Sequence, residues 1–249
     1  MPTGGHVGTR ALVLQHQRNA PPALLSDWAR ARAIEIVVVR ADRARELPAI
    51  DGFAFAITLW SDHSAGHRRP PWVERELGWM RAAHQAELPI LGICFGAQAL
   101  AVALGGSVHR ETRPEIGWIS VESAAPEIVA GGPWFAWHED VFDPPEGAAG
   151  VARNAFGPQA FLAGPHLGVQ FHPEVTPEVA EMWGARPSGV RWLALAGIDL
   201  GRLLHEGARH VERTTVASFS LFDAFAARAA SHSGRPPAAI ASGALTPRT

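Results

Sequence analysis

Short apolar runs alternate with helix-like segments over the first part of the chain. The apolar runs predict strands at residues 10–15, 34–39, 52–58 and 89–93. The segments between and after them predict helices at 20–32, 70–87 and 95–104. The run IEIVVV at 34–39 is nearly continuous and β-branched, as in a strand buried on both faces. This alternation predicts an α/β fold with a mostly parallel sheet covered by helices on both faces.

The pattern changes between residues 106 and 171. Strand-like pieces separated by turn residues lie at 118–122, 150–153, 160–163 and 167–171. They predict an antiparallel or mixed part of the sheet. A helical pattern returns after Thr176.

We expect a single domain over residues 10–230, in which 185–230 form a helical extension. Residues 1–9 are small and polar, and we expect them to be flexible. Residues 231–249 are rich in Ala, Ser, Gly and Pro, a composition typical of a disordered tail.

Composition excludes several classes of function. The net charge of -2 gives no basis for binding nucleic acid or an anionic membrane. No apolar run approaches the ~20 residues of a bilayer span, and no signal-peptide core is present, so we expect a cytoplasmic protein. The single cysteine excludes an internal disulfide and a cysteine-rich zinc site. All 22 basic residues are arginines, which excludes lysine Schiff bases and a Walker-type lysine. We expect neither a cofactor nor a metal ion.

The single cysteine lies in a motif that suits a nucleophile. Cys94 stands in the sequence Gly92-Ile93-Cys94-Phe95-Gly96, between a predicted strand and a predicted helix. This is the cysteine version of the strand–elbow–helix turn of serine hydrolases. The start of the helix favours the thiolate, and the backbone N–H of Phe95 can donate to an oxyanion. The alternative is a buried, inert cysteine.

A thiol nucleophile needs a base, and His172 is the candidate. It closes the predicted strand 167–171 and is followed directly by Pro173 and Glu174. A carboxylate two residues later can accept from the far ring nitrogen, which fixes the tautomer and the ring orientation.

The segments PILGICFGAQALA and GVQFHPE together resemble the class I glutamine amidotransferases, whose triad is cysteine, histidine and glutamate. Within that family the chain is most similar to the stand-alone, GMP-synthase-like amidotransferases. The stretches GGSVHR, EIGW and WHEDVFDPPEGA carry this closer similarity.

The resemblance implies a flavodoxin-like three-layer sandwich that hydrolyses the side-chain amide of glutamine. Cys94 would form a γ-glutamyl thioester, His172 would transfer the protons, and Glu174 would orient His172. Gln98 matches the family's glutamine four residues after the nucleophile and would contact substrate. The chain shows no phosphate-binding loop and no room for a synthetase domain, so the ammonia acceptor would be a separate synthetase.

One segment departs from the family pattern. After the third predicted strand, the family has a glycine-rich turn that supplies a second oxyanion N–H, whereas this chain has Trp60 and Ser61 there. Ser61 can still donate its N–H, because only proline lacks one. Trp60 cannot adopt a glycine-only conformation without strain, so the sequence leaves open whether the oxyanion hole is weakened. We expect Trp60 to line the substrate site.

The polar residues His138, Glu139 and Asp140 follow an aromatic stretch at 134–137. His138 could bind the amino or carboxylate group of the substrate. The alternative is a solvated loop with an aromatic anchor.

Two other functions stay open. The same triad and thioester serve a free-standing γ-glutamyl hydrolase or peptidase that acts on amides other than glutamine. The second alternative is a weakly active or inactive family member with a binding role. It is suggested by Trp60 at the position where the family has glycine.

Overall fold

The computed structural model describes residues 9–232. Its strands are β1 (Arg10–Gln15), β2 (Glu35–Arg40), β3 (Phe55–Thr58), β4 (Ile90–Ile93), β5 (Ser107–Ile119), β6 (Glu122–Ser123), β7 (Trp134–Asp143), β8 (Ala149–Asn154), β9 (Gly157–Ala163) and β10 (His166–Val169). Its helices are α1 (Leu24–Ala31), α2 (Pro71–Gln85), α3 (Phe95–Ala103), α4 (Pro177–Ala185), α5 (Pro187–Ala196) and α6 (Leu200–His232).

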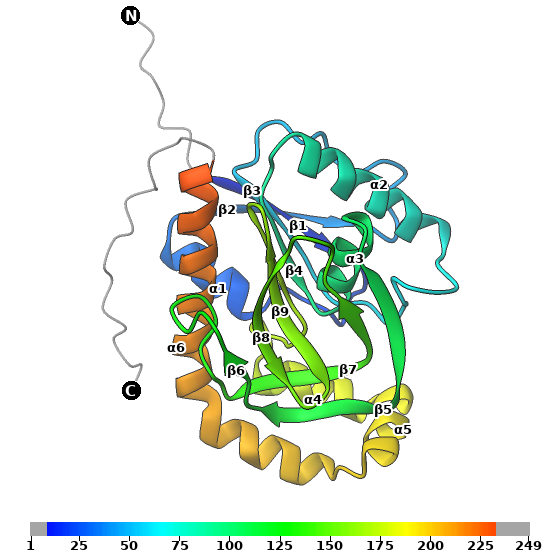
Figure 1. Ribbon diagram of the computed structural model, residues 1–249. Helices are drawn as coiled ribbons and strands as arrows, with labels where there is room; N and C mark the ends of the chain where they lie inside the picture. The colour runs from blue at the N-terminus through cyan, green and yellow to red at the C-terminus, as the bar shows by residue number, and fades with distance from the viewer. Residues whose placement is uncertain (1–8, 233–249) are drawn as a thin grey trace, which may run out of the picture.

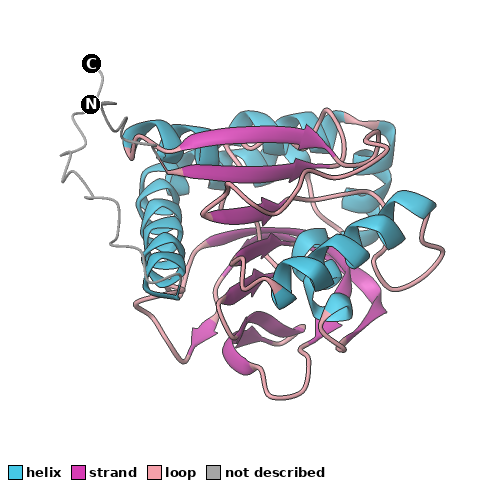
Figure 2. Ribbon diagram, turned by 90° about the horizontal axis from the view of Figure 1, so that it is seen from above, coloured by secondary structure: helices cyan, strands magenta, loops and turns pink. Residues whose placement is uncertain are grey.

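The main sheet has eight strands in the order β2-β1-β3-β4-β10-β9-β8-β6. Neighbours from β2 to β10 run parallel, and those from β10 to β6 run antiparallel. Helices α2 and α3 cover one face and α1 and α6 the other, so three layers form (Figures 1 and 2). The predicted fold class is confirmed, including the change from parallel to antiparallel pairing.

The long helix α6 is held against α1 by one partly buried cluster. Asp223 accepts from Arg32 at 2.9 and 2.7 Å and from the indole N–H of Trp28 at 2.8 Å. The Asp223 carboxylate raises the pKa of Arg32, mainly through this hydrogen bond. The ring of Trp28 packs on Phe55 of β3 and on Phe222 of α6. The helical extension is thereby joined to the sheet.

The prediction for β2 was wrong in one respect. It is the edge strand of the sheet and is not buried on both faces, and Val38 is 43% exposed. An apolar β-branched run cannot distinguish an edge strand from a central one, since strand order comes from the whole sheet. Helix α1 begins at Leu24, four residues later than expected, because the chain passes through Pro21 and Pro22 first.

The central region was predicted least well. Strands β5 and β7 pair as a separate two-stranded sheet, although the sequence predicted only 118–122 there. The first half of β5 is polar and exposed, so it lacked an apolar signal. The stretch from Trp134 to Asp140 is part of β7 and not a solvated loop.

Two predicted boundaries also differ. Strand β10 ends at Val169, so His172 lies beyond it and makes an isolated bridge with Phe135. Helix α6 continues to His232, two residues into the predicted tail. The rest of that tail and residues 1–8 lie outside the described residues, and the predicted domain boundaries stay a prediction. Within residues 9–232, no helix has the length and apolar character that a bilayer crossing requires.

Candidate active site

Cys94 occupies a sharp turn between β4 and α3. Its backbone has φ 51° and ψ −108°, an unfavourable region for a residue with a side chain. The flanking glycines permit this turn. A Cβ on Gly92 would lie 2.6 Å from the Gly96 carbonyl oxygen, and one on Gly96 would lie 2.2 Å from that of Thr58. The predicted elbow is therefore present in the structure, with the sulfur at the start of a helix.

His172 and Glu174 form a buried pair on the turn after β10. The Nδ1 atom of His172 donates to Oε1 of Glu174 at 2.8 Å, and both side chains are almost fully buried. The backbone N–H of His172 donates to the Phe135 carbonyl at 2.8 Å, which fixes the turn. Within the described residues, His172 Nε2 has no hydrogen-bond partner. One ring nitrogen is thus committed and the other is available.

The electrostatics link the histidine to both neighbours. Burial by itself lowers the pKa of His172, but the charges of Glu174 and Cys94 outweigh it, and the pKa is raised to about 10. The histidine therefore holds a second proton at neutral pH. An imidazolium next to a thiol is the arrangement that stabilises a thiolate.

Gln170 contacts the sulfur directly, although the sequence assigned it no role. Its Nε2 atom donates to Cys94 Sγ at 3.7 Å, and the backbone N–H of Cys94 donates to the Val169 carbonyl at 2.8 Å. The segment Val169–Gln170 thus holds the elbow from the side of β10. The position of Gln170 in GVQFHPE, two residues before the histidine, was the only available signal.

The two residues predicted as oxyanion donors both line the pocket that contains Cys94. Phe95 is the first residue of α3, so its N–H has no acceptor within the helix. Ser61 follows β3 and lines the same pocket. Trp60 does not show the expected strain, because the described non-glycine residues with positive φ are Ala23, Ala33, Arg68, Glu87 and Cys94.

Trp60 belongs to an aromatic wall. Its ring lies 4.3 Å from that of Trp183, and the Trp183 ring lies 4.9 Å edge-on from His172. Trp137 and Trp192 extend this wall toward α5 with parallel rings 6.3 Å apart. The wall keeps water from one side of the histidine and borders the pocket.

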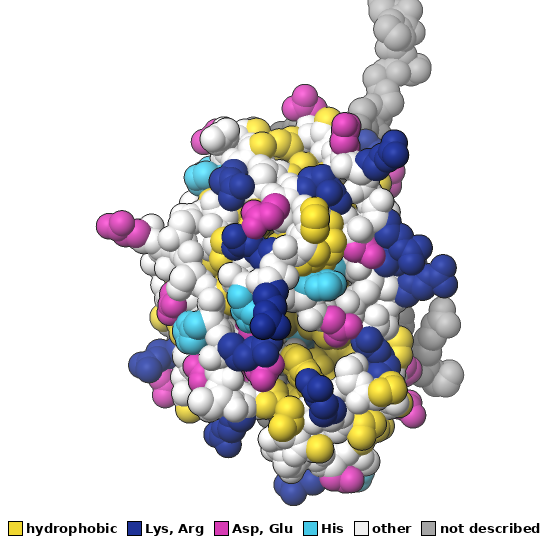
Figure 3. All heavy atoms as spheres, turned by 90° about the vertical axis from the view of Figure 1, so that its right-hand side faces the viewer, with side chains coloured by type: hydrophobic (Ala, Val, Ile, Leu, Met, Phe, Trp, Pro, Cys, Tyr) yellow, Lys and Arg dark blue, Asp and Glu magenta, His cyan; other side chains and the backbone are white. Residues whose placement is uncertain are grey.

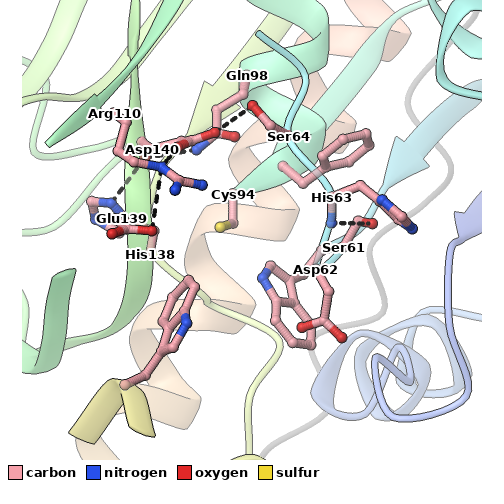
Figure 4. A pocket seen from close by; sticks show the side chains of 13 residues that line it. Ser61, Asp62, His63, Ser64, Cys94, Gln98, Arg110, His138, Glu139 and Asp140 are labelled. Atoms are coloured by element: carbon pink, nitrogen blue, oxygen red, sulfur yellow. Dashed lines mark hydrogen bonds and ion pairs between the residues drawn. The ribbon is translucent and has the colours of Figure 1, made fainter. Parts of the chain in front are cut away.

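The pocket is lined by polar side chains opposite that wall (Figure 4). Gln98 donates from Nε2 to the Asp140 carbonyl at 2.8 Å. The Arg110 guanidinium lies 3.4 Å from carboxylate oxygens of both Glu139 and Asp140, and Ser64 donates to Asp140. Gln98 lines the pocket, and its contact with substrate stays a prediction. Arg110 and Asp140 come from β5 and β7, whose pairing the sequence did not predict.

His138 is also at the pocket, but both of its ring nitrogens are engaged. Nδ1 donates to the Asp140 carbonyl at 3.1 Å, and Nε2 donates to Glu115 at 2.8 Å. Glu115 also accepts from Asn154 at 2.6 Å and from Gln159 at 2.9 Å. This buried network leaves His138 no free nitrogen for a substrate.

The described part of the chain holds no group of three or more His, Cys, Asp or Glu side chains arranged for a metal ion.

The segment that holds the candidate triad matches a known family. Residues 64–183 match the sequence model of the family described as glutamine amidotransferase class-I. This part of the chain, just under half of it, is similar to class I glutamine amidotransferases. The matched range includes Cys94, His172 and Glu174, whereas Trp60 and Ser61 precede it.

Similar proteins support this assignment. The glutamine-hydrolysing GMP synthase of Thermomicrobium roseum is 43% identical over 98 residues, which make up 36% of this chain and 19% of that protein. The corresponding enzyme of Aeropyrum pernix is 40% identical over 95 residues, again 19% of that protein. The chain thus spans about a fifth of the length of these curated relatives.

Solved structures match over a larger share. A glutamine amidotransferase from Thermotoga maritima superposes with a TM-score of 0.79 and 26% identity, covering 88% of this chain and 98% of that one. A glutamine amidotransferase from Methylobacillus flagellatus, at 23% identity and a TM-score of 0.76, shows the same fold.

Charged, histidine and apolar side chains share the face formed by α2, the loop after β3, β5 and α5. Arginine and histidine side chains gather near the middle of this face, beside apolar side chains (Figure 3).

Proposed function

We propose that this domain hydrolyses the side-chain amide of glutamine through a γ-glutamyl thioester on Cys94 and delivers ammonia to a separate synthetase. The observation that supports it most is the combination of a strained elbow at Cys94 with a buried His172–Glu174 pair whose Nε2 is unpartnered. The family match and the similarity to glutamine-hydrolysing enzymes support glutamine as the substrate.

Acylation starts from the sulfur and the histidine. The proton of the Cys94 thiol resides on His172, and the sulfur attacks the amide carbon, forming the S–C bond. The negative charge moves to the amide oxygen, which accepts hydrogen bonds from the N–H groups of Phe95 and Ser61. His172 then gives its proton to the amide nitrogen, the C–N bond breaks, and ammonia leaves.

Deacylation repeats these steps with water. His172 takes a proton from a water molecule as its oxygen attacks the thioester carbon. The C–S bond breaks, the thiolate is regenerated next to the imidazolium, and glutamate leaves. Glu174 remains ionised and holds the ring orientation throughout.

The rest of the substrate fits the polar side of the pocket. Because Nε2 of Gln98 is committed to the Asp140 carbonyl, its Oε1 is the atom available to accept from a substrate N–H. Arg110 is half-exposed and can turn guanidinium N–H groups toward a carboxylate. Trp60 forms the apolar wall along the methylene groups.

The free-standing γ-glutamyl hydrolase remains the alternative. The side chains of Trp60 and Trp192 border the pocket, and aromatic surface there would suit a larger amine than ammonia. The strain that suggested an inactive family member is absent at Trp60, because this residue is not in a left-handed conformation.

A direct assay tests the proposal. Purified protein is given glutamine or a panel of other γ-glutamyl amides, and glutamate release is measured, with Cys94→Ala as the control. We expect release from glutamine that disappears in the Cys94→Ala variant. Release only from the other amides would favour the hydrolase, and no release from any substrate would contradict both enzymatic functions. Ammonia delivery is tested by adding a candidate synthetase and measuring its aminated product with glutamine as the sole nitrogen source.

A further inference from the structure

A second buried histidine lies behind the turn that carries Ser61. His16 directly follows β1, and its Nε2 atom lies 2.8 Å from Oε2 of Glu76 on α2. The other carboxylate oxygen of Glu76 accepts from the Thr58 hydroxyl at 2.6 Å. All three side chains are buried, although neither His16 nor Glu76 lines the catalytic pocket. The proposed chemistry makes no use of this network.

The contacts of both ring nitrogens fix the orientation of the His16 ring. Its Nδ1 atom lies 3.2 Å from the Trp60 carbonyl oxygen, and because a carbonyl can only accept, Nδ1 must be the donor. The ring stacks on Trp72 at 5.1 Å and meets the Phe95 ring edge-on at 4.9 Å. Glu76 and these two rings therefore hold Nδ1 on the carbonyl.

The hydrogen bond that holds the Trp60 carbonyl also orients the backbone N–H of Ser61. The Trp60–Ser61 peptide is planar and trans, so the Ser61 N–H points away from the Trp60 oxygen. His16 contacts the oxygen side of this peptide, while Ser61 and Cys94 line the catalytic pocket that His16 does not line. A hydrogen bond to the carbonyl also polarises the peptide and strengthens its N–H as a donor.

We propose that His16, held by Glu76, is a positioning residue that fixes the Trp60–Ser61 peptide so that the Ser61 N–H completes the oxyanion hole. The inference rests on the proposed acyl-transfer function. It supplies a reason why tryptophan can replace glycine at position 60. The carbonyl is anchored from behind by a side chain, so the turn does not depend on a glycine conformation. Stability alone would not require the pair, since a buried ion pair is often no more stabilising than apolar packing.

A matched pair of variants separates the two ring nitrogens. In His16→Asn the side-chain amide nitrogen takes the place of Nδ1 and can still donate to the Trp60 carbonyl. In His16→Gln the amide lies near the place of Nε2, reaches Glu76 and leaves the carbonyl without its donor. We expect His16→Gln to lower kcat about tenfold or more with an unchanged KM, and His16→Asn to retain about a third of kcat or more.

The rates of two reactions of Cys94 distinguish a positioning role of His16 from a purely structural one. Acylation by a p-nitrophenyl ester passes through an oxyanion, whereas alkylation by iodoacetamide does not. We expect His16→Gln to slow acylation about tenfold and to leave alkylation within about twofold of the wild-type rate. Equal rates of acylation in both variants and the wild type would overturn the proposal, as would equal losses in acylation and alkylation.

The design keeps the outcome separate from the proposed substrate. If wild-type protein does not hydrolyse glutamine but His16→Gln selectively slows ester acylation, the proposed function fails and the positioning role stands. If His16→Asn does not fold, His16→Gln still decides, because it must lose acylation and keep alkylation. If His16→Gln does not fold, a selective loss of acylation in His16→Asn would overturn the proposal.

Discussion

Three buried histidines in this domain donate to a glutamate at the same distance of 2.8 Å, yet only one of them is placed for catalysis. His16 and His138 use both ring nitrogens, since each also donates to a backbone carbonyl. His172 leaves Nε2 unpartnered and lies next to Cys94. A histidine–carboxylate pair by itself therefore indicates no function. The state of the second nitrogen distinguishes a ring that can move a proton from one that holds backbone in place.

The largest expected effect comes from removing the available nitrogen. His172→Gln should lower the rate of glutamate release about a thousandfold or more, because the variant has no group to accept and return the proton. His205→Gln, which changes an exposed histidine of α6, is the control and should retain the wild-type rate. Steady-state kinetics with glutamine measure both. A loss below about tenfold for His172→Gln would remove it from the mechanism.

The carboxylate of the same pair should affect both the rate and its pH dependence. With the pKa of His172 raised to about 10, the imidazolium persists as the pH rises and is lost only near that value. We expect kcat/KM to fall on the alkaline side near pH 10. Glu174→Gln removes an attraction that raises the pKa, so this fall should move to lower pH and the maximum rate should drop about a hundredfold. A pH–rate profile identical in shape to wild type would show that Glu174 does not set the protonation of His172.

For the His138 pair we expect a loss of stability and little change in chemistry. Glu115→Gln replaces the carboxylate that accepts from His138, Asn154 and Gln159 in a buried network, and an unsatisfied buried polar group costs about 1–3 kcal/mol. Urea unfolding should show this loss, while kcat per folded molecule stays within about threefold of wild type. If kcat falls further while KM rises, His138 binds substrate after all, as the sequence had predicted.

The smallest effect concerns the backbone that supports Cys94. Gly96→Ala would bring a methyl group against the Thr58 carbonyl, so we expect a loss of about 1–3 kcal/mol on unfolding and lower activity. Gly150→Ala adds the same methyl group where no atom lies within 4 Å and serves as the control. Equal unfolding free energies for the two variants would show that the elbow tolerates a side chain at position 96.

The candidate site divides into a part that sequence reasoning could find and a part that it could not. Cys94 and Phe95 lie in one continuous segment, and His172 and Glu174 in another, so local spacing was enough to propose them. The family resemblance added Gln98. Asp140 was noticed as part of a polar cluster, but Arg110 comes from the polar, exposed half of β5, which carries no periodic apolar signal. His16 and Glu76 are 60 residues apart, and a pair of that kind exists only when two elements pack.

The sequence by itself determined the α/β class, the parallel half of the sheet and the two motifs that meet where β4 and β10 end. These follow from local rules, since apolar periodicity, glycine at a tight turn and a histidine close to a glutamate act over a few residues. Strand order, the exposed edge at β2, the separate β5–β7 sheet and the unstrained turn at Trp60 were decided by the tertiary structure alone. These features depend on which elements, distant in sequence, pack against each other. They also depend on which buried side-chain nitrogens form a hydrogen bond, as His16 does with the Trp60 carbonyl.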